Sequence, residues 1–128
     1  MHDGGEAALN FQQACKKLAM TQSQLENTQR DAGESWKLEY VRLRREMAIQ
    51  LGKVYEGMQK LNVPPSSYDA YAKLREAFSQ MRSTVALHQA SWPAVIIKHD
   101  DPEYLTSIKK VRQSNQVFNS ALEAFSKL

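Results

Sequence analysis

The sequence predicts an all-α fold, an antiparallel helical bundle of three long helices with a fourth helix at the N-terminus. Three stretches of the 128-residue chain carry apolar residues at alternating spacings of three and four, which is the period of an amphipathic helix. The chain has only five glycines and four prolines, few for a protein of strands and tight turns. Because this length suits one compact domain, we expect residues 1–128 to form a single helical domain.

The first stretch, residues 1–33, has the weakest helical pattern. Phe11, Cys15, Leu18 and Leu25 share one helical face, but the residues from 20 to 31 are rich in Gln, Asn, Thr and Ser. Gly33 either separates this stretch from the next helix or lies within one very long helix, at a cost of about 1 kcal/mol. The sequence therefore leaves open an N-terminal helix of a four-helix bundle or an arm that extends a three-helix bundle.

The second stretch, residues 34–62, has the strongest pattern. Its apolar stripe is Trp36, Tyr40, Leu43, Met47, Leu51, Val54, Met58 and Leu61. Pro64 and Pro65 follow, and we expect them to end this helix because proline lacks an N–H and restricts the residue before it.

The third stretch, residues 66–92, starts with the Ser-x-x-acid spacing of a capping box, from Ser66 to Asp69. Its stripe is Tyr71, Leu74, Phe78, Met81, Val85, His88 and Trp92, and Pro93 should end or kink the helix. The short apolar run at 94–97 then predicts a connector that tucks its side chains under the end of the bundle.

The fourth stretch, residues 101–127, begins with a strong helix start. Asp101 can accept hydrogen bonds from free N–H groups, Pro102 suits the first turn, and Glu103 favours the positive end of the helix. The stripe that follows is Tyr104, Ile108, Val111, Asn115, Phe118, Leu122 and Phe125.

A second face of the 34–62 helix points to a binding partner. Leu38 and Ile49 lie opposite the main stripe, with Val41 beside them and Arg42 and Arg45 on the same face. Either the N-terminal segment or a second protein should cover this face. We expect the partner to be another protein or a second copy of this chain, with a homo-oligomer favoured.

Polar residues within the stripes predict structural roles rather than a catalytic or metal site. His88 and Asn115 occupy matching positions of two helices, where lone polar residues set register, and we expect them to meet across the bundle. The run His99-Asp100-Asp101 does not favour a metal site, because three consecutive residues rarely supply ligands that converge from several directions. Cys15 has no base beside it in the sequence and reads as a small buried hydrophobe. We expect no cofactor.

Charge and cysteine content favour a cytoplasmic protein without a strong electrostatic partner. Seventeen Lys and Arg against fourteen Asp and Glu give a net charge of +3, which permits a nucleic acid without indicating one. The single cysteine suits a reducing compartment. No signal peptide or membrane-spanning run is apparent, so we expect no membrane association.

These features favour a non-catalytic module for protein–protein interaction or assembly, such as an adaptor, a regulatory subunit or a chaperone-like protein. The basic groups Arg42, Arg44, Arg45 and Lys109, Lys110, Arg112 leave one alternative, a helical dimer that contacts the phosphates of a nucleic acid. The other alternative is a small all-helical enzyme that binds an anionic metabolite.

The stretch from Arg44 to Lys53 resembles the arginine-rich part of the long first helix in the all-helical chorismate mutases. The resemblance implies a basic site for a dicarboxylate. Tyr55 stands where that family has a downstream lysine, and the upstream segment lacks the family's arginine, so we do not assign the chain to it.

Overall fold

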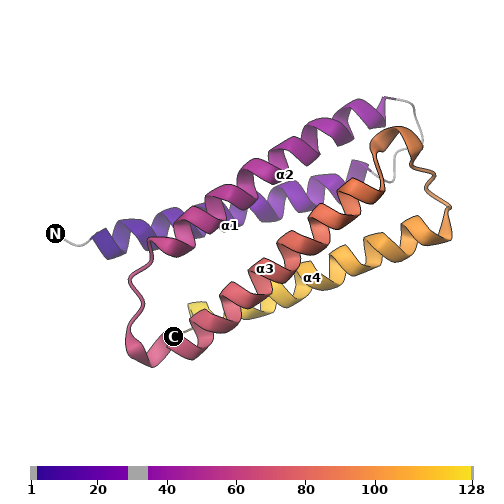
Figure 1. The fold of residues 1–128 in the computed structure, drawn as a ribbon. Helices are drawn as coiled ribbons and strands as arrows, with labels where there is room; N and C mark the ends of the chain where they lie inside the picture. The colour runs from indigo at the N-terminus through magenta and orange to yellow at the C-terminus, as the bar shows by residue number, and fades with distance from the viewer. Residues whose placement is uncertain (1–2, 29–34, 128) are drawn as a thin grey trace. The chain divides into compact units, whose positions relative to one another are not determined.

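The computed structural model describes residues 3–28 and 35–127, and this part of the chain is all-α, as predicted, without a strand (Figure 1). Four long helices span Asp3–Thr28 (α1), Trp36–Gln59 (α2), Tyr68–Ser91 (α3) and Pro102–Ser126 (α4). Short 3-10 helices precede α3 and α4, at Pro65–Ser67 (η1) and Ala94–Ile96 (η2). The chain divides into two compact units, one ending at Asn62 and the other beginning at Val63.

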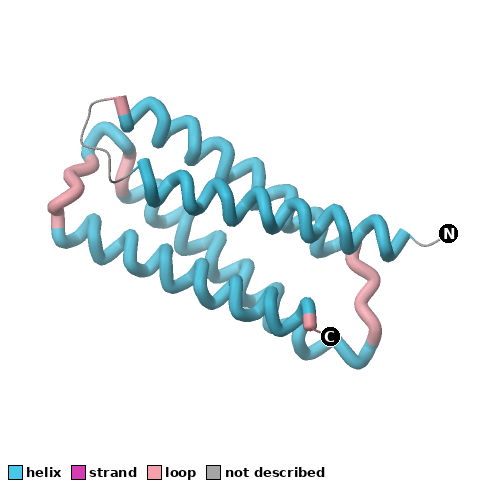
Figure 2. Tube along the Cα trace, turned by 180° about the vertical axis from the view of Figure 1, so that it is seen from behind, coloured by secondary structure: helices cyan, strands magenta, loops and turns pink. Residues whose placement is uncertain are grey.

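The first unit is an antiparallel pair of helices, α1 and α2 (Figures 1 and 2). The N-terminal segment is therefore a helix of its own that returns along α2, not an extension of it. The sequence left open where the first helix ends and the second begins, near Gly33 and Glu34. These two residues lie outside the described part of the chain.

Burial in this unit follows the predicted stripes. Seven of the eight stripe residues of α2 are buried, and Leu61, beyond the end of the helix, is half-buried. On α1, Phe11, Cys15 and Leu18 are buried, together with Ala14 and Thr21, while Leu25 is half-buried. Each fully buried side chain of the size of leucine contributes about 1.5–3 kcal/mol.

The two helices of the first unit approach closely where Phe11 meets Gly57. A Cβ atom on Gly57 would lie 3.3 Å from both the Cα and the Cδ1 of Phe11, tighter than an ordinary van der Waals contact. The absence of a side chain at Gly57 therefore lets the aromatic residue of α1 rest against the backbone of α2.

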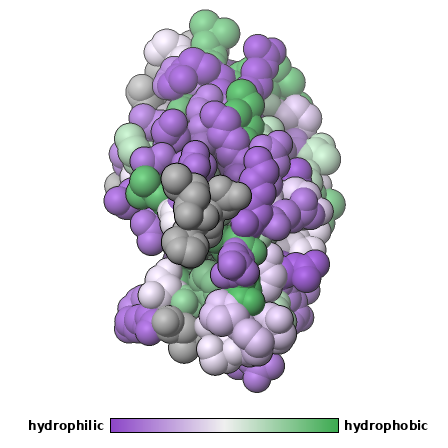
Figure 3. Space-filling view, turned by 90° about the vertical axis from the view of Figure 1, so that its left-hand side faces the viewer, coloured by the Kyte–Doolittle hydropathy of each residue, from purple (hydrophilic) through white to green (hydrophobic). Residues whose placement is uncertain are grey.

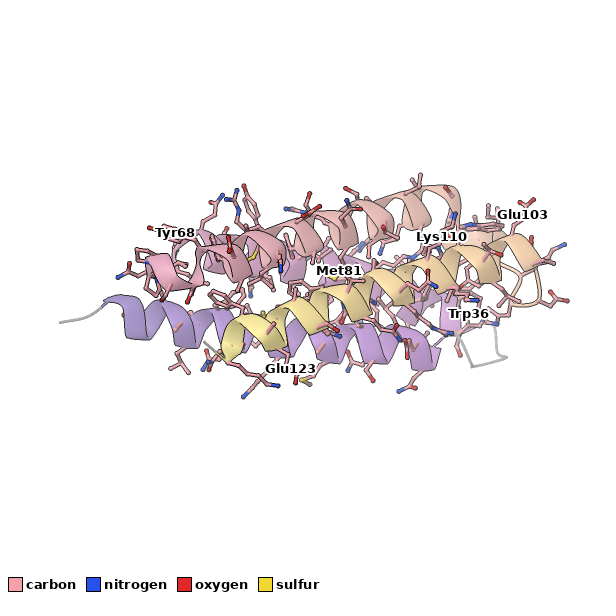
Figure 4. All side chains as sticks on the ribbon, turned by 90° about the horizontal axis from the view of Figure 1, so that it is seen from below. Trp36, Tyr68, Met81, Glu103, Lys110 and Glu123 are labelled. Atoms are coloured by element: carbon pink, nitrogen blue, oxygen red, sulfur yellow. The ribbon has the colours of Figure 1, made fainter. Side chains whose placement is uncertain are left out.

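The second unit is the antiparallel pair α3 and α4, whose starts lie at opposite ends of the hairpin, marked by Tyr68 and Glu103 in Figure 4. Aromatic pairs connect the two helices. Phe78 and Phe118 meet edge to face with ring centroids 5.8 Å apart, and Tyr71 meets Phe125 at 5.8 Å. Such pairs contribute about 0.5–1.5 kcal/mol beyond the area they bury.

Of the two helix caps predicted for the second unit, the structure confirms one. Asp101 caps α4 as predicted, since its Oδ1 accepts a hydrogen bond of 2.9 Å from the backbone N–H of Glu103. The capping box at Ser66 is wrong. Pro65 starts a 3-10 turn in which the N–H of Ser67 donates to the carbonyl of Pro64, and Ser67, not Ser66, is the N-cap of α3, without a side-chain cap. The N–H of Tyr68, at the start of α3, likewise donates to the carbonyl of Pro65.

Only two of the four apolar residues in the connector between α3 and α4 are buried as predicted. Ala94 and Ile97 are buried, but Val95 is 78% exposed and Ile96 is 53% exposed. A 3-10 turn over Ala94–Ile96 directs neighbouring side chains to different sides, so all four cannot be buried together.

Within the described ranges, no helix combines the length and the apolar character needed to cross a membrane. Hydrophilic residues cover most of the face drawn in Figure 3, with hydrophobic residues in small patches among them.

Candidate functional site

The predicted docking strip, formed by Leu38, Val41, Arg42, Arg45 and Ile49, lies on α2 and is exposed along its whole length. Leu38 is 80% exposed and Ile49 is 51% exposed, and Val41 is also at the surface. The strip lies away from the buried stripe because its residues are displaced from that stripe by about half a helical turn. The structure therefore brings all five predicted partner-binding residues to one exposed face of α2.

An ion pair anchors one side of the docking strip. Arg42 and Glu39 are one helical turn apart, and the Nε of Arg42 donates to Oε2 of Glu39 at 3.0 Å while Nη2 donates to Oε1. This hydrogen bond, with the charge of Arg42, lowers the pKa of Glu39, and the same contact raises the pKa of Arg42. The pair orients Arg42 along the helix, whereas no described residue forms an ion pair with Arg45.

Arg44 lies outside the docking strip, so the three neighbouring arginines of α2 do not form one basic surface. Its guanidinium lies over the ring of Tyr40, 4.5 Å from the centroid, and its Nη2 donates to the Tyr40 hydroxyl at 3.1 Å. Glu46 is engaged as well, because its Oε1 accepts a hydrogen bond of 2.6 Å from Nε2 of the buried Gln50. The two bases of the docking strip, Arg42 and Arg45, are thus flanked by two acids that lie outside it, Glu39 and Glu46.

The exposed large apolar residues of the second unit are scattered. Leu87 on α3 is 68% exposed, and Leu105 and Val117 on α4 are 51% and 59% exposed. The sequence analysis did not single these residues out. The signal that could have found them is their place off the apolar stripes of their helices, and single apolar residues of this kind are common on protein surfaces.

His88 lies in an aromatic cluster of the second unit rather than opposite Asn115. Its Nδ1 is 2.6 Å from the Oγ of Ser107, and its ring lies tilted against that of Tyr104, with centroids 5.7 Å apart. Trp92 meets the same tyrosine edge to face at 5.4 Å. Asn115 is half-buried, and its Oδ1 has no hydrogen-bond partner among the described residues.

Ser107 and His88 are as close as a nucleophile and its general base, but both residues lie where α3 packs on α4. His88 is 6% exposed and both residues lie inside regular helices, which leaves their backbone N–H groups bonded within the helix. We therefore assign the contact to packing of α3 on α4.

Two other predicted residues take apolar surroundings. Cys15 is buried, and desolvation raises the pKa of its thiol to about 12, as expected for a small buried hydrophobe. The ring of His99 lies tilted against that of Tyr104, with centroids 6.3 Å apart. Across the described part of the chain, no three side chains of His, Cys, Asp and Glu gather closely enough to hold a metal ion.

Comparisons with known proteins give no family for the chain. No protein-family model matches it, and searches of curated proteins and of solved structures find no match either.

Proposed function

We propose that this chain is a non-catalytic module for protein–protein interaction or assembly in the cytoplasm, and that it acts by docking the exposed face of α2 against a partner helix. The observation that carries the proposal is the exposure of Leu38 and Ile49 on one face of α2. Burial of apolar surface contributes about 25 cal/mol per Å² before the entropic costs of association. Helix-in-groove and helix-on-helix recognition use such a strip of apolar anchors with a charged rim.

A second copy of the chain is the partner that the charges of the strip favour. A two-fold contact requires a surface that complements itself, because each residue of one copy faces a residue of the same strip in the other. The strip carries Arg42 and Arg45, and Glu39 and Glu46 flank it on the same helix. Two such strips in antiparallel register can place acids against bases, whereas a strip of one sign would repel its copy.

The experiment is sedimentation analysis of the full chain over a range of concentrations, with a matched pair of substitutions. Leu38→Asp places a charge on the most exposed apolar residue of the strip, and Leu87→Asp places the same charge on a similarly exposed leucine of α3. We expect the wild type and Leu87→Asp to self-associate as concentration rises, and Leu38→Asp to remain a monomer with an unchanged helical circular-dichroism spectrum.

Two results would contradict the proposal. Equal weakening of assembly by both leucine substitutions would show that the α2 face has no special part in it. A wild type that remains monomeric throughout the micromolar range would remove the self-assembly form of the proposal.

A further inference from the structure

The first unit contains a groove between α1 and α2 that the docking strip does not include. Its open volume is about 250 Å³, and small residues line it: Ala7 and Ala14 from α1 and Gly57 from α2. The groove exists because these residues have little or no side chain to fill the space between the helices. Since one water takes about 30 Å³ in the liquid, the volume holds a small ligand with several waters.

Three ammonium groups surround this groove. Lys17 comes from α1, Lys53 from α2, and Lys60 from the residue that caps α2. Antiparallel packing brings them together, because positions near the start of α1 lie beside the end of α2, as the contact of Phe11 with Gly57 shows. Among the described residues, none of the three lysines forms an ion pair.

The remaining polar groups of the groove suit an oxyanion. Asn10 and Gln13 line it and carry amide N–H₂ donors, and Glu56 is the single carboxylate against three lysines. The lining residues therefore have a net charge of +2. Lysine binds phosphate as a compact point charge with three donors.

We propose that this groove binds a phosphate group, either as the free ion or as part of a small phosphorylated metabolite. The three lysines would neutralise the anion and the two amides would donate to its oxygens, while Glu56 would oppose it. No residue of the groove belongs to the docking strip, so phosphate binding and the proposed function are tested by different substitutions.

The test is calorimetric titration of the full chain with inorganic phosphate, at an ionic strength held constant with sodium chloride. We expect saturable binding at one site. Lys17→Gln, Lys53→Gln and Lys60→Gln should each weaken it by about three- to fivefold, which is the range of a single exposed charge contact. Glu56→Gln should strengthen binding by a similar factor, because it removes the one opposing charge.

Lys16→Gln is the matched control, since Lys16 is the exposed neighbour of Lys17 on α1 and does not line the groove. It should leave phosphate affinity unchanged. The proposal is overturned if the wild type shows no saturable binding, if Lys16→Gln weakens binding as much as Lys17→Gln, or if Glu56→Gln fails to strengthen it. Leu38→Asp, which tests the docking strip, should bind phosphate as the wild type does. Glycerol phosphate, titrated in parallel, separates the two sources: tighter binding than inorganic phosphate indicates a metabolite, and weaker binding the free ion.

Discussion

His88 and Ser107 connect α3 to α4 through a side-chain hydrogen bond in which Nδ1 of the histidine and Oγ of the serine are 2.6 Å apart. The histidine is 6% exposed and its ring also packs on Tyr104. The contact thus combines a polar bond with aromatic packing at the end of the hairpin that η2 closes.

Replacing His88 with alanine should destabilise the protein more than replacing Ser107. His88→Ala removes the aromatic packing on Tyr104 together with the hydrogen bond to the half-buried Ser107 hydroxyl, and a hydrogen bond contributes about 0.5–1.5 kcal/mol by itself. Ser107→Ala removes less volume. The free energy of unfolding in urea measures both, with Ser79→Ala as a control because Ser79 is exposed on α3. Equal stability of His88→Ala and the wild type would disprove the assignment.

Two glycines of α2 should respond differently to the same substitution. Gly52→Ala should stabilise the protein by about 0.5–1 kcal/mol, because alanine favours the helix and a Cβ at Gly52 meets nothing within 4 Å. Gly57→Ala should lack this gain, since its Cβ would press on Phe11 at 3.3 Å. Urea unfolding of the two variants gives the comparison. A gain at Gly57 as large as that at Gly52 would mean that α1 and α2 are not in close contact there.

The thiol of Cys15 should be unreactive in the folded protein. Burial raises its pKa from the usual 9.0 to about 12, and the thiolate is the reactive form. We expect negligible alkylation by iodoacetamide at pH 8 until urea unfolds the chain. Rapid alkylation without denaturant would contradict the burial of Cys15.

The raised pKa of Cys15 makes the free energy of unfolding decrease as the pH rises through the alkaline range. The folded state holds the thiol proton more tightly than the unfolded state does, so this contribution is complete below pH 9 and is lost as pH rises toward 12. The advantage of the wild type over Cys15→Ala in free energy of unfolding should therefore shrink between pH 9 and pH 11. Because lysines and tyrosines titrate in both proteins, only the difference between them is informative.

Periodicity was sufficient to predict the helices and most of their buried residues, but not the partner of His88. In an antiparallel pair, residues equally far from the connection lie side by side. His88 is three residues before the end of α3 and Ser107 is five residues after the start of α4, whereas Asn115 is thirteen residues after it. Counting from the connector, rather than matching positions within the stripes, would have led to Ser107.

The candidate sites were predictable to different degrees. The docking strip follows from one helix, because the angle between residues such as Leu38 and Leu43 is set by the sequence alone. The lysine groove joins Lys17 to Lys53, residues 36 positions apart, and no local pattern indicates which turn of α1 lies beside which turn of α2. The turn at η1 also escaped prediction, because Ser66 and Ser67 both suit an N-cap.

The ion pair between Glu39 and Arg42 should contribute little to stability and only above acid pH. The hydrogen bond from Arg42 lowers the pKa of Glu39, so the contribution is present above the usual pKa of 4.5 and disappears as pH falls below it. Both side chains are exposed, where solvent screens the attraction. Glu39→Gln should unfold at nearly the same urea concentration as the wild type at pH 7. A large loss of stability in Glu39→Gln would show that the docking strip is already buried in an assembly.

Nucleic acid should bind this chain weakly. Affinity for a duplex falls with salt in proportion to the number of phosphates that the protein neutralises, with a slope of about −0.9 per contact. Arg42 and Arg44 are held by Glu39 and Tyr40, which leaves few arginines of α2 for phosphates. We therefore expect a shallow slope, of about −2 or less, when binding to a fluorescent duplex is measured from low to physiological salt. A slope of about −5 or steeper, reduced by Arg45→Gln and not by Lys16→Gln, would instead favour a helical dimer that contacts phosphates, and the exposed face of α2 would then serve a nucleic acid rather than a protein.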